Sequence, residues 1–217
     1  MVESPKIFEI FRLLRELYPH AQCELNFSSP FELLIATILS AQCTDRRVNL
    51  ITKDLFAKYK HPSAYVEATL PELEGDIRSC GLYRTKAKNI VNCCRELCSR
   101  YECRVPVTIA ELRSLPGVGR KTANVVAATA FHVPALGVDT HVYRLARRLG
   151  LAFGQTPEKV EQELCAKLPP EDWIAAHHLL IWHGRRTCHA RKPDCAICPL
   201  ANYCDHHTLE SRRLGHE

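Results

Sequence analysis

Four cysteines near the end of the chain are spaced as metal ligands are. Cys188, Cys195, Cys198 and Cys204 follow a C-x6-C-x2-C-x5-C pattern. Four thiolates this near in sequence can close a tetrahedral zinc site or hold an iron–sulfur cluster. On spacing alone, zinc is the commoner metal at such a site. Four histidines close to the pattern also leave zinc as an alternative: His183, His189, His206 and His207. The spacing therefore predicts a metal centre without deciding its kind.

A second set of residues has the spacing of a phosphate-binding turn. In TIAELRSLPGVGRKTANVVAATAF (residues 108–131), Gly117 and Gly119 lie between two helical segments. Glycine lets the backbone turn tightly and approach a ligand, and the free N–H groups that begin the next helix favour a phosphate. The glycine–lysine spacing fits neither a P-loop nor a dinucleotide fingerprint. The pattern predicts a helix-hairpin-helix element that binds a nucleic-acid backbone. The alternative is an ordinary helical hairpin with a glycine turn.

Lys121 lies in the first turn of the second of these helices. A lysine beside such a loop can simply contact phosphate. It can also act as a nucleophile, because the positive end of the helix and neighbouring cations disfavour its charged form, and a neutral amine can attack an electrophilic carbon. Its position alone does not decide between these roles.

The elements that must hold these residues are predicted to be helices. Prolines follow capping residues at Ser4, Ser29 and Thr156, and the capping-box spacing recurs at Ser29, Thr69 and Thr108. Apolar residues recur at helical steps through residues 7–17 and 87–101, whereas 31–41 is apolar on nearly every side. Convincing strand alternation is absent. The sequence therefore predicts an all-α protein of about ten short helices, with residues 31–41 central and buried.

Charge and composition indicate a globular protein with a polyanion-binding surface. The 217 residues are 46% apolar, with a net charge of +5. Residues 84–148 hold 12 Lys and Arg against 4 acids, which is typical of nucleic-acid binding, although a solvated helix face is the alternative. No apolar run is long enough to span a membrane, and the N-terminus lacks a secretion signal. We therefore expect a reducing compartment, in which the other eight of the 12 cysteines are buried free thiols.

Four motifs stand in a definite order along the chain: LSAQCTD (39–45), LPGVGRKTA (115–123), VDTH (138–141) and the cysteine pattern. In order and spacing they resemble the endonuclease III family of DNA glycosylases and abasic-site lyases, and the resemblance covers essentially the whole chain. It implies that Lys121 is the catalytic nucleophile and Asp139 the second catalytic residue. Asp139 can also be an ordinary helix N-cap, and the two roles are compatible because helix N–H groups would keep the carboxylate ionised.

The same resemblance implies which residues contact DNA and which metal centre is held. The substrate base must leave the duplex, and Gln42 and Leu82 would fill the gap. Further DNA contacts would come from Gly117, Gly119, Arg120, Thr140, His141, Arg191 and Lys192. The four terminal cysteines would hold one [4Fe–4S] cluster, which keeps the loop with Arg191 and Lys192 rigid.

The architecture implied by the resemblance is two helical domains flanking a DNA-binding cleft. A six-helix barrel (21–132) would contain the helix-hairpin-helix (about 108–131). Residues 1–20 and 133–217 would form a discontinuous iron–sulfur domain. The implied function is a monomeric base-excision-repair enzyme of bacterial type. It would be cytoplasmic and nucleoid-associated, and would remove oxidised pyrimidines from double-stranded DNA and cleave abasic sites by β-elimination. The alternative is a non-catalytic DNA-binding module with a structural metal.

Overall fold

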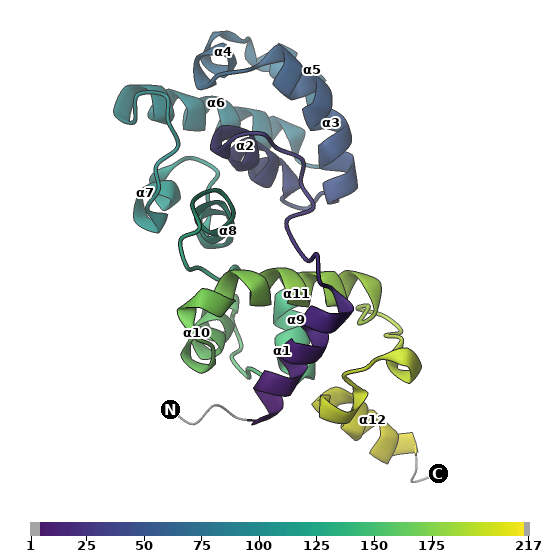
Figure 1. Ribbon diagram of the computed structural model, residues 1–217. Coiled ribbons are helices and arrows are strands. Elements are labelled where there is room, and N and C mark those ends of the chain that lie inside the picture. Colours follow the sequence, from purple (N-terminus) through teal and green to yellow (C-terminus); the bar gives the residue numbers. More distant parts are fainter. Residues whose placement is uncertain (1–4, 215–217) are drawn as a thin grey trace. The chain divides into compact units, whose positions relative to one another are not determined.

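The computed structural model describes residues 5–214, and side chains as far as residue 209. These residues contain twelve α-helices and three short 3-10 turns and no strand, so the predicted all-α class is confirmed. The chain divides into two compact units (Figure 1). One unit is Glu24–Val133, and the other combines the described residues of Met1–Cys23 and Pro134–Glu217.

The unit Glu24–Val133 is built around α2 (Pro30–Ser40), which packs against α3, α6 and α8. Every residue from Phe31 to Leu39 except Glu32 is buried, as the continuous apolar run predicts, whereas Ser40 is half-buried and Ala41 is exposed. The other helices of this unit are α3 (Asp45–Lys58), α4 (Pro62–Glu67), α5 (Leu70–Asp76), α6 (Tyr83–Arg100), α7 (Ile109–Ser114) and α8 (Arg120–Phe131). That is seven helices where the resemblance implied six, because α4 and α5 each begin with their own cap or proline.

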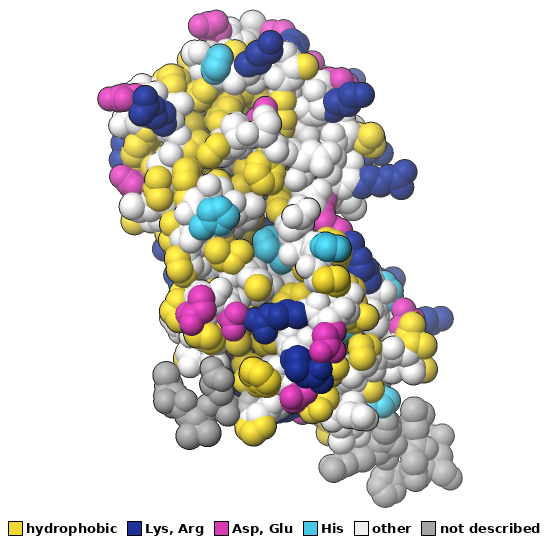
Figure 2. Space-filling view, in the orientation of Figure 1, with side chains coloured by type: hydrophobic (Ala, Val, Ile, Leu, Met, Phe, Trp, Pro, Cys, Tyr) yellow, Lys and Arg dark blue, Asp and Glu magenta, His cyan; other side chains and the backbone are white. Residues whose placement is uncertain are grey.

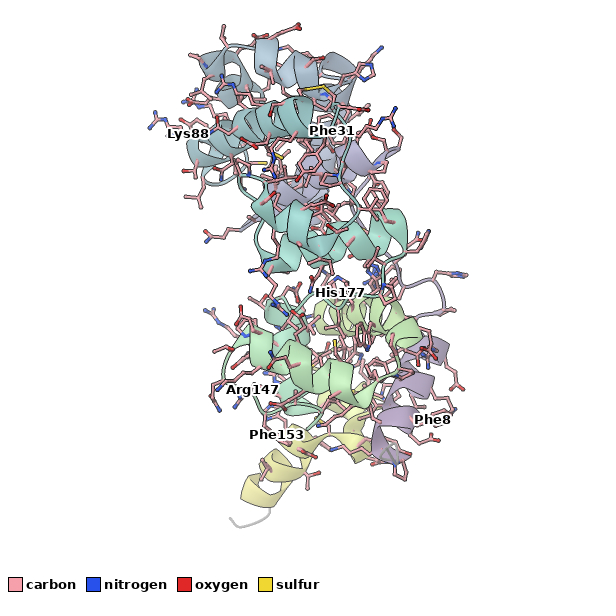
Figure 3. The ribbon with its side chains drawn as sticks, turned by 90° about the vertical axis from the view of Figure 1, so that its left-hand side faces the viewer. Phe8, Phe31, Lys88, Arg147, Phe153 and His177 are labelled. Carbon is pink, nitrogen blue, oxygen red and sulfur yellow. A yellow bond between two sulfur atoms is a disulfide. The ribbon has the colours of Figure 1, made fainter. Side chains whose placement is uncertain are left out.

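The second unit packs α11 (Trp173–Arg186) against α9 (Thr140–Arg148) and α1 (Pro5–Leu17). It continues with α10 (Pro157–Lys167), the 3-10 turns Pro170–Asp172, Cys195–Ile197 and Ala201–Tyr203, and α12 (Asp205–Leu214). In α1 the buried face is Ile7, Ile10, Phe11 and Leu14. Phe8, which the periodicity placed on an apolar face, is 59% exposed and lies on the outside of α1 (Figure 3).

Predicted helix starts are confirmed wherever the structure describes them. The hydroxyl of Ser29 accepts from the N–H of Glu32, and Thr108 and Thr156 cap α7 and α10 in the same way. The predicted cap Ser4 lies outside the described residues. These caps satisfy N–H groups that would otherwise lack partners at each helix start.

The free-thiol prediction for the remaining cysteines is wrong for two of the eight. Cys98, near the end of α6, forms a disulfide with Cys103. The chain turns back after α6 through Glu102 and Cys103, both with positive φ, which brings the two cysteines together. The sequence could not show this turn because it contains no glycine. Cys80, Cys93 and Cys94 are buried free thiols, as expected, whereas Cys23, Cys43 and Cys165 are only half-buried.

On the face drawn in Figure 2, Lys and Arg side chains are interspersed with Asp and Glu. No continuous basic patch covers that face. No helix among residues 5–214 combines the length and apolar character that a membrane span needs.

Candidate functional site

The predicted helix-hairpin-helix is formed by α7 and α8, which pack against each other. Gly117 has φ +79°, and a Cβ there would lie 2.8 Å from Cβ of Asn89 on α6, so both the backbone and the packing require glycine. Gly119 differs, because a Cβ on it would meet no atom within 4 Å. Nothing in the described residues demands a glycine at 119. The open space above this residue, at the start of α8, suits the approach of an external phosphate.

Lys121 is the second residue of α8 and is half-buried. Its amine takes part in no hydrogen bond or ion pair with the part of the chain that the structure describes. Arg120 precedes it at the first helical position, and the buried residues Ala123–Ala128 anchor the rest of α8. The helix therefore holds an unengaged amine directly after the glycine turn.

Gln42 and Leu82 share an unusual backbone conformation. Both are exposed and have positive φ, at 53° and 58°. Left-handed backbone is costly for residues other than glycine, and the surrounding structure must hold it in place. The two loops lie side by side, because a Cβ on Gly81 would be 3.5 Å from the carbonyl oxygen of Gln42. The structure thus brings together the two residues that the resemblance assigns to gap filling.

A buried lysine fixes these two loops. Lys86 of α6 is 4% exposed, and its Nζ donates to the carbonyl of Leu39 at 2.8 Å. The N–H of Lys86 also donates to the carbonyl of Leu82. Lys86 therefore ties the end of α2, just before Gln42, to the start of α6, just after Leu82. Sequence reasoning counted Lys86 only as a basic residue; its place on the apolar face of α6 was the available signal.

Asp139 is the N-cap of α9, as predicted. Its Oδ1 accepts from the backbone N–H groups of His141 and Val142, each at 2.8 Å. Oδ2 is left for other partners on this half-buried carboxylate. Thr140, the first residue of α9, is exposed.

His141 packs against Arg144 at the start of α9. Nη2 of Arg144 lies 3.1 Å from Nδ1 of His141 and also donates to the carbonyls of Gly184 and Cys188. Burial lowers the pKa of His141 and the Arg144 and Arg185 charges lower it further, whereas Asp139 and the Gly184 carbonyl act in the opposite direction. The imidazole therefore lies two residues from Asp139 in surroundings that disfavour its protonation.

The four terminal cysteines line one cavity, as the spacing predicted. Its wall includes Leu145 of α9, Leu149 directly after that helix, His183 of α11, and two of the predicted histidine neighbours, His206 and His207. His183 is 1% exposed; its Nδ1 bonds to the hydroxyl of Tyr18, and its Nε2 lies 3.5 Å from Sγ of Cys198. His183 is thus placed to support a ligand cysteine. His189, in contrast, lies against Asp194.

The chemistry of this cavity fits a metal centre. Burial raises the pKa of the Cys198 and Cys204 thiols, and the proximity of Cys188 raises the pKa of both further. A cationic centre would offset both effects, because it binds thiolates.

Two arginines of α9 hold the cysteine loop, and sequence reasoning missed both roles. Arg144 donates to the carbonyls of Gly184 and Cys188, at 2.9 and 3.0 Å. Arg148 donates to Sγ of Cys188 at 3.2 Å. Their separation by four residues on one helix face was the available signal. Arg191 and Lys192 are both exposed in the same loop.

The predicted residues thus form local groups within each unit. The hairpin with Lys121, and the pair Gln42 and Leu82, belong to Glu24–Val133. Asp139, His141 and the cysteine cavity belong to the other unit.

Two protein-family models match the chain. The model for the HhH-GPD superfamily base excision DNA repair protein matches residues 35–170, which span the hairpin and Asp139. The model for the iron-sulfur binding domain of endonuclease III matches residues 188–204, which begin and end on predicted ligands. The cysteine cavity is therefore an iron–sulfur site rather than a zinc site.

Individual relatives cover nearly the full chain. Endonuclease III of Bacillus subtilis (strain 168) is 52% identical over 190 residues, covering 87% of each chain. Endonuclease III of Escherichia coli (strain K12) is 47% identical over 205 residues, covering 94% of this chain and 97% of the relative.

Comparison with solved structures gives the same result for the fold. One titled as a trapped endonuclease III–DNA covalent intermediate has a TM-score of 0.94 and 47% identity, covering 98% of this chain and 100% of that one. A non-covalent endonuclease III–DNA complex matches with a TM-score of 0.93 and the same identity and coverage. The chain therefore belongs to the endonuclease III family of HhH-GPD base excision DNA repair proteins, with the activity of a DNA glycosylase and abasic-site lyase.

Proposed function

We propose that this enzyme removes oxidised pyrimidines from double-stranded DNA and cleaves the resulting abasic site through a Schiff base on Lys121. The main support for the proposal is the half-buried amine of Lys121, directly after the glycine turn. It forms no hydrogen bond or ion pair with the described part of the chain. The covalent intermediate named for a relative of 47% identity supports a covalent step.

In the proposed chemistry, the unprotonated Nζ of Lys121 attacks C1′ of the extruded nucleotide. The C1′–N glycosidic bond breaks, its electron pair leaves with the base, and the base takes up a proton released by the amine. The C1′–O4′ bond then opens, O4′ takes up the second amine proton, and an imine forms between Nζ and C1′. Loss of a proton from C2′ then expels the 3′ phosphate, and water releases the lysine. Only a lysine that is not already paired can begin this sequence.

Asp139 is proposed to stabilise the positive charge that develops on the sugar and to accept a proton. Its cap contacts use Oδ1 and fix the side chain, which leaves Oδ2 for the substrate. Thr140 and His141, at the start of the same helix, are proposed to contact the DNA. The imidazole of His141 can donate a hydrogen bond to a phosphate oxygen.

Gln42 and Leu82 are proposed to enter the duplex where the damaged nucleotide leaves it. Leu82 is 59% exposed, and an apolar side chain held out in strained backbone is suited to insertion between bases. Gly117, Gly119 and Arg120 are proposed to bind the phosphate backbone. We propose that the enzyme acts as a monomer on chromosomal DNA, in the cytoplasm at the nucleoid.

Incision of defined duplexes tests the proposed substrate class. Duplexes with one thymine glycol or one abasic site should be cut, while an 8-oxoguanine duplex and an undamaged duplex should stay largely intact. Faster cutting of the purine lesion than of thymine glycol would contradict the proposal.

The four cysteines, Cys188, Cys195, Cys198 and Cys204, are proposed to hold one [4Fe–4S] cluster. Purified protein should then be yellow-brown and contain about four irons and four sulfides per chain. The cluster's proposed contribution is structural, because it would fix the loop with Arg191 and Lys192. Stoichiometric zinc without iron or sulfide, measured in natively expressed protein, would contradict this assignment.

A further inference from the structure

Arg148, the last residue of α9, joins a cluster ligand to the basic loop. Its Nη1 donates to Sγ of Cys188 at 3.2 Å and to the carbonyl of His189 at 2.7 Å. Its Nη2 donates to the carbonyl of Ala190 at 3.0 Å. One half-buried guanidinium thus contacts the ligand sulfur and the two residues that lead into Arg191 and Lys192.

The helix that carries Arg148 gives this contact a rigid base. Val142, Leu145 and Ala146 of α9 are fully buried in the core of their unit. The carbonyl of Arg148 itself lies 3.3 Å from Sγ of a second ligand, Cys204. The side chain and the backbone of one residue therefore lie against two of the four ligands.

We infer that Arg148 is a positioning residue that tunes the iron–sulfur cluster through the sulfur of Cys188 and fixes the basic loop. The inference rests on the proposed function for the identity of the cluster and for the role of the loop. Hydrogen bonds to ligand sulfurs and nearby charge are among the factors that set cluster potentials. A cationic donor favours the more negative, reduced cluster, so Arg148 raises the reduction potential. Outer-shell partners of this kind commonly change affinity for a metal centre about 10- to 100-fold.

Arg147 is a matched control on the same helix. Its Nη1 donates to the carbonyls of Phe153 and Gly154, at 3.0 and 2.9 Å, and its guanidinium lies over the ring of Tyr143. Arg147 and Phe153 lie close together in Figure 3. The two arginines are adjacent and equally charged, but only Arg148 contacts a ligand cysteine.

The test compares Arg148→Gln with Arg147→Gln in the full-length, cluster-loaded protein. Protein-film voltammetry should give a lower cluster potential for Arg148→Gln and an unchanged one for Arg147→Gln. Bleaching of the cluster absorbance by an iron chelator should be about 10-fold faster for Arg148→Gln. Equal potentials and equal bleaching rates in the two variants would overturn the inference.

If Arg148→Gln fails to retain the cluster, Arg148→Lys provides a second test. Lysine keeps the positive charge but lacks the forked guanidinium that reaches three acceptors. The cluster potential and the bleaching rate of Arg148→Lys should therefore lie between those of the wild type and Arg148→Gln. A lysine variant identical to wild type in both readouts would overturn the role assigned to the guanidinium.

Lys192→Ala separates this inference from the proposed function. It should make the log–log salt dependence of duplex binding shallower by about one contact, roughly 0.9, and leave the cluster potential unchanged. An unchanged salt dependence would count against the proposed loop contact but not against Arg148. Wild-type protein without iron or sulfide would refute the cofactor, and with it the inference.

Discussion

Lys121→Gln is expected to abolish strand nicking on a duplex with one abasic site. Glutamine keeps a side chain of similar length but cannot form an imine, so the lyase rate should fall on the order of 10⁴-fold or more, as for other lost nucleophiles. Affinity for the same duplex should stay nearly unchanged, because one cation among many contributes little. Nicking on a denaturing gel and binding by anisotropy give the two readouts.

Lys88→Gln provides the control for this change. Lys88 lies in the same unit as Lys121, on the exposed face of α6 (Figure 3). Its replacement removes the same charge and should leave nicking at the wild-type rate. If Lys121→Gln also nicked at the wild-type rate, Lys121 would be only a phosphate contact.

Asp139→Asn is expected to lower turnover on the order of 10²–10⁴-fold, the loss typical of a catalytic acid–base group. Asparagine caps a helix about as well as aspartate, so the N–H groups of His141 and Val142 keep their acceptor. The melting temperature should therefore hardly change. Single-turnover release of thymine glycol and thermal unfolding measure the two effects.

Asp139→Ala separates the two roles of this residue further. Alanine loses both the charge and the cap, so it should lower turnover as asparagine does and also cost about 1 kcal/mol of stability. A near-wild-type turnover for Asp139→Asn, with loss only in Asp139→Ala, would show that Asp139 is a cap and not a catalytic group.

Features set by local sequence could be predicted. The caps at Ser29, Thr108 and Asp139 depend on contacts two or three residues along the chain, which the sequence displays directly. The burial of α2 follows from its continuous apolar run. The cysteine cavity follows from short spacing, which brings the four ligands together in one compact loop.

Features that depend on tertiary packing could not be predicted from the sequence. Left-handed backbone at Gln42 and Leu82 carries no residue signal, since both are ordinary side chains. In the sequence, Arg148 is only one of several basic residues. Its role depends on the fold, which places it beside Cys188, forty residues away in sequence. The disulfide between Cys98 and Cys103 likewise depends on a turn that no glycine or proline marks.

Locating the covalent adduct tests the central claim most directly. Wild-type enzyme is reacted with an abasic duplex in sodium borohydride, which reduces an imine to a stable amine. Digestion with nuclease and protease, followed by tandem mass spectrometry, then identifies the modified residue. The account predicts the sugar remnant on Lys121. A remnant on another lysine or on the N-terminal amine, with Lys121 unmodified, would contradict it.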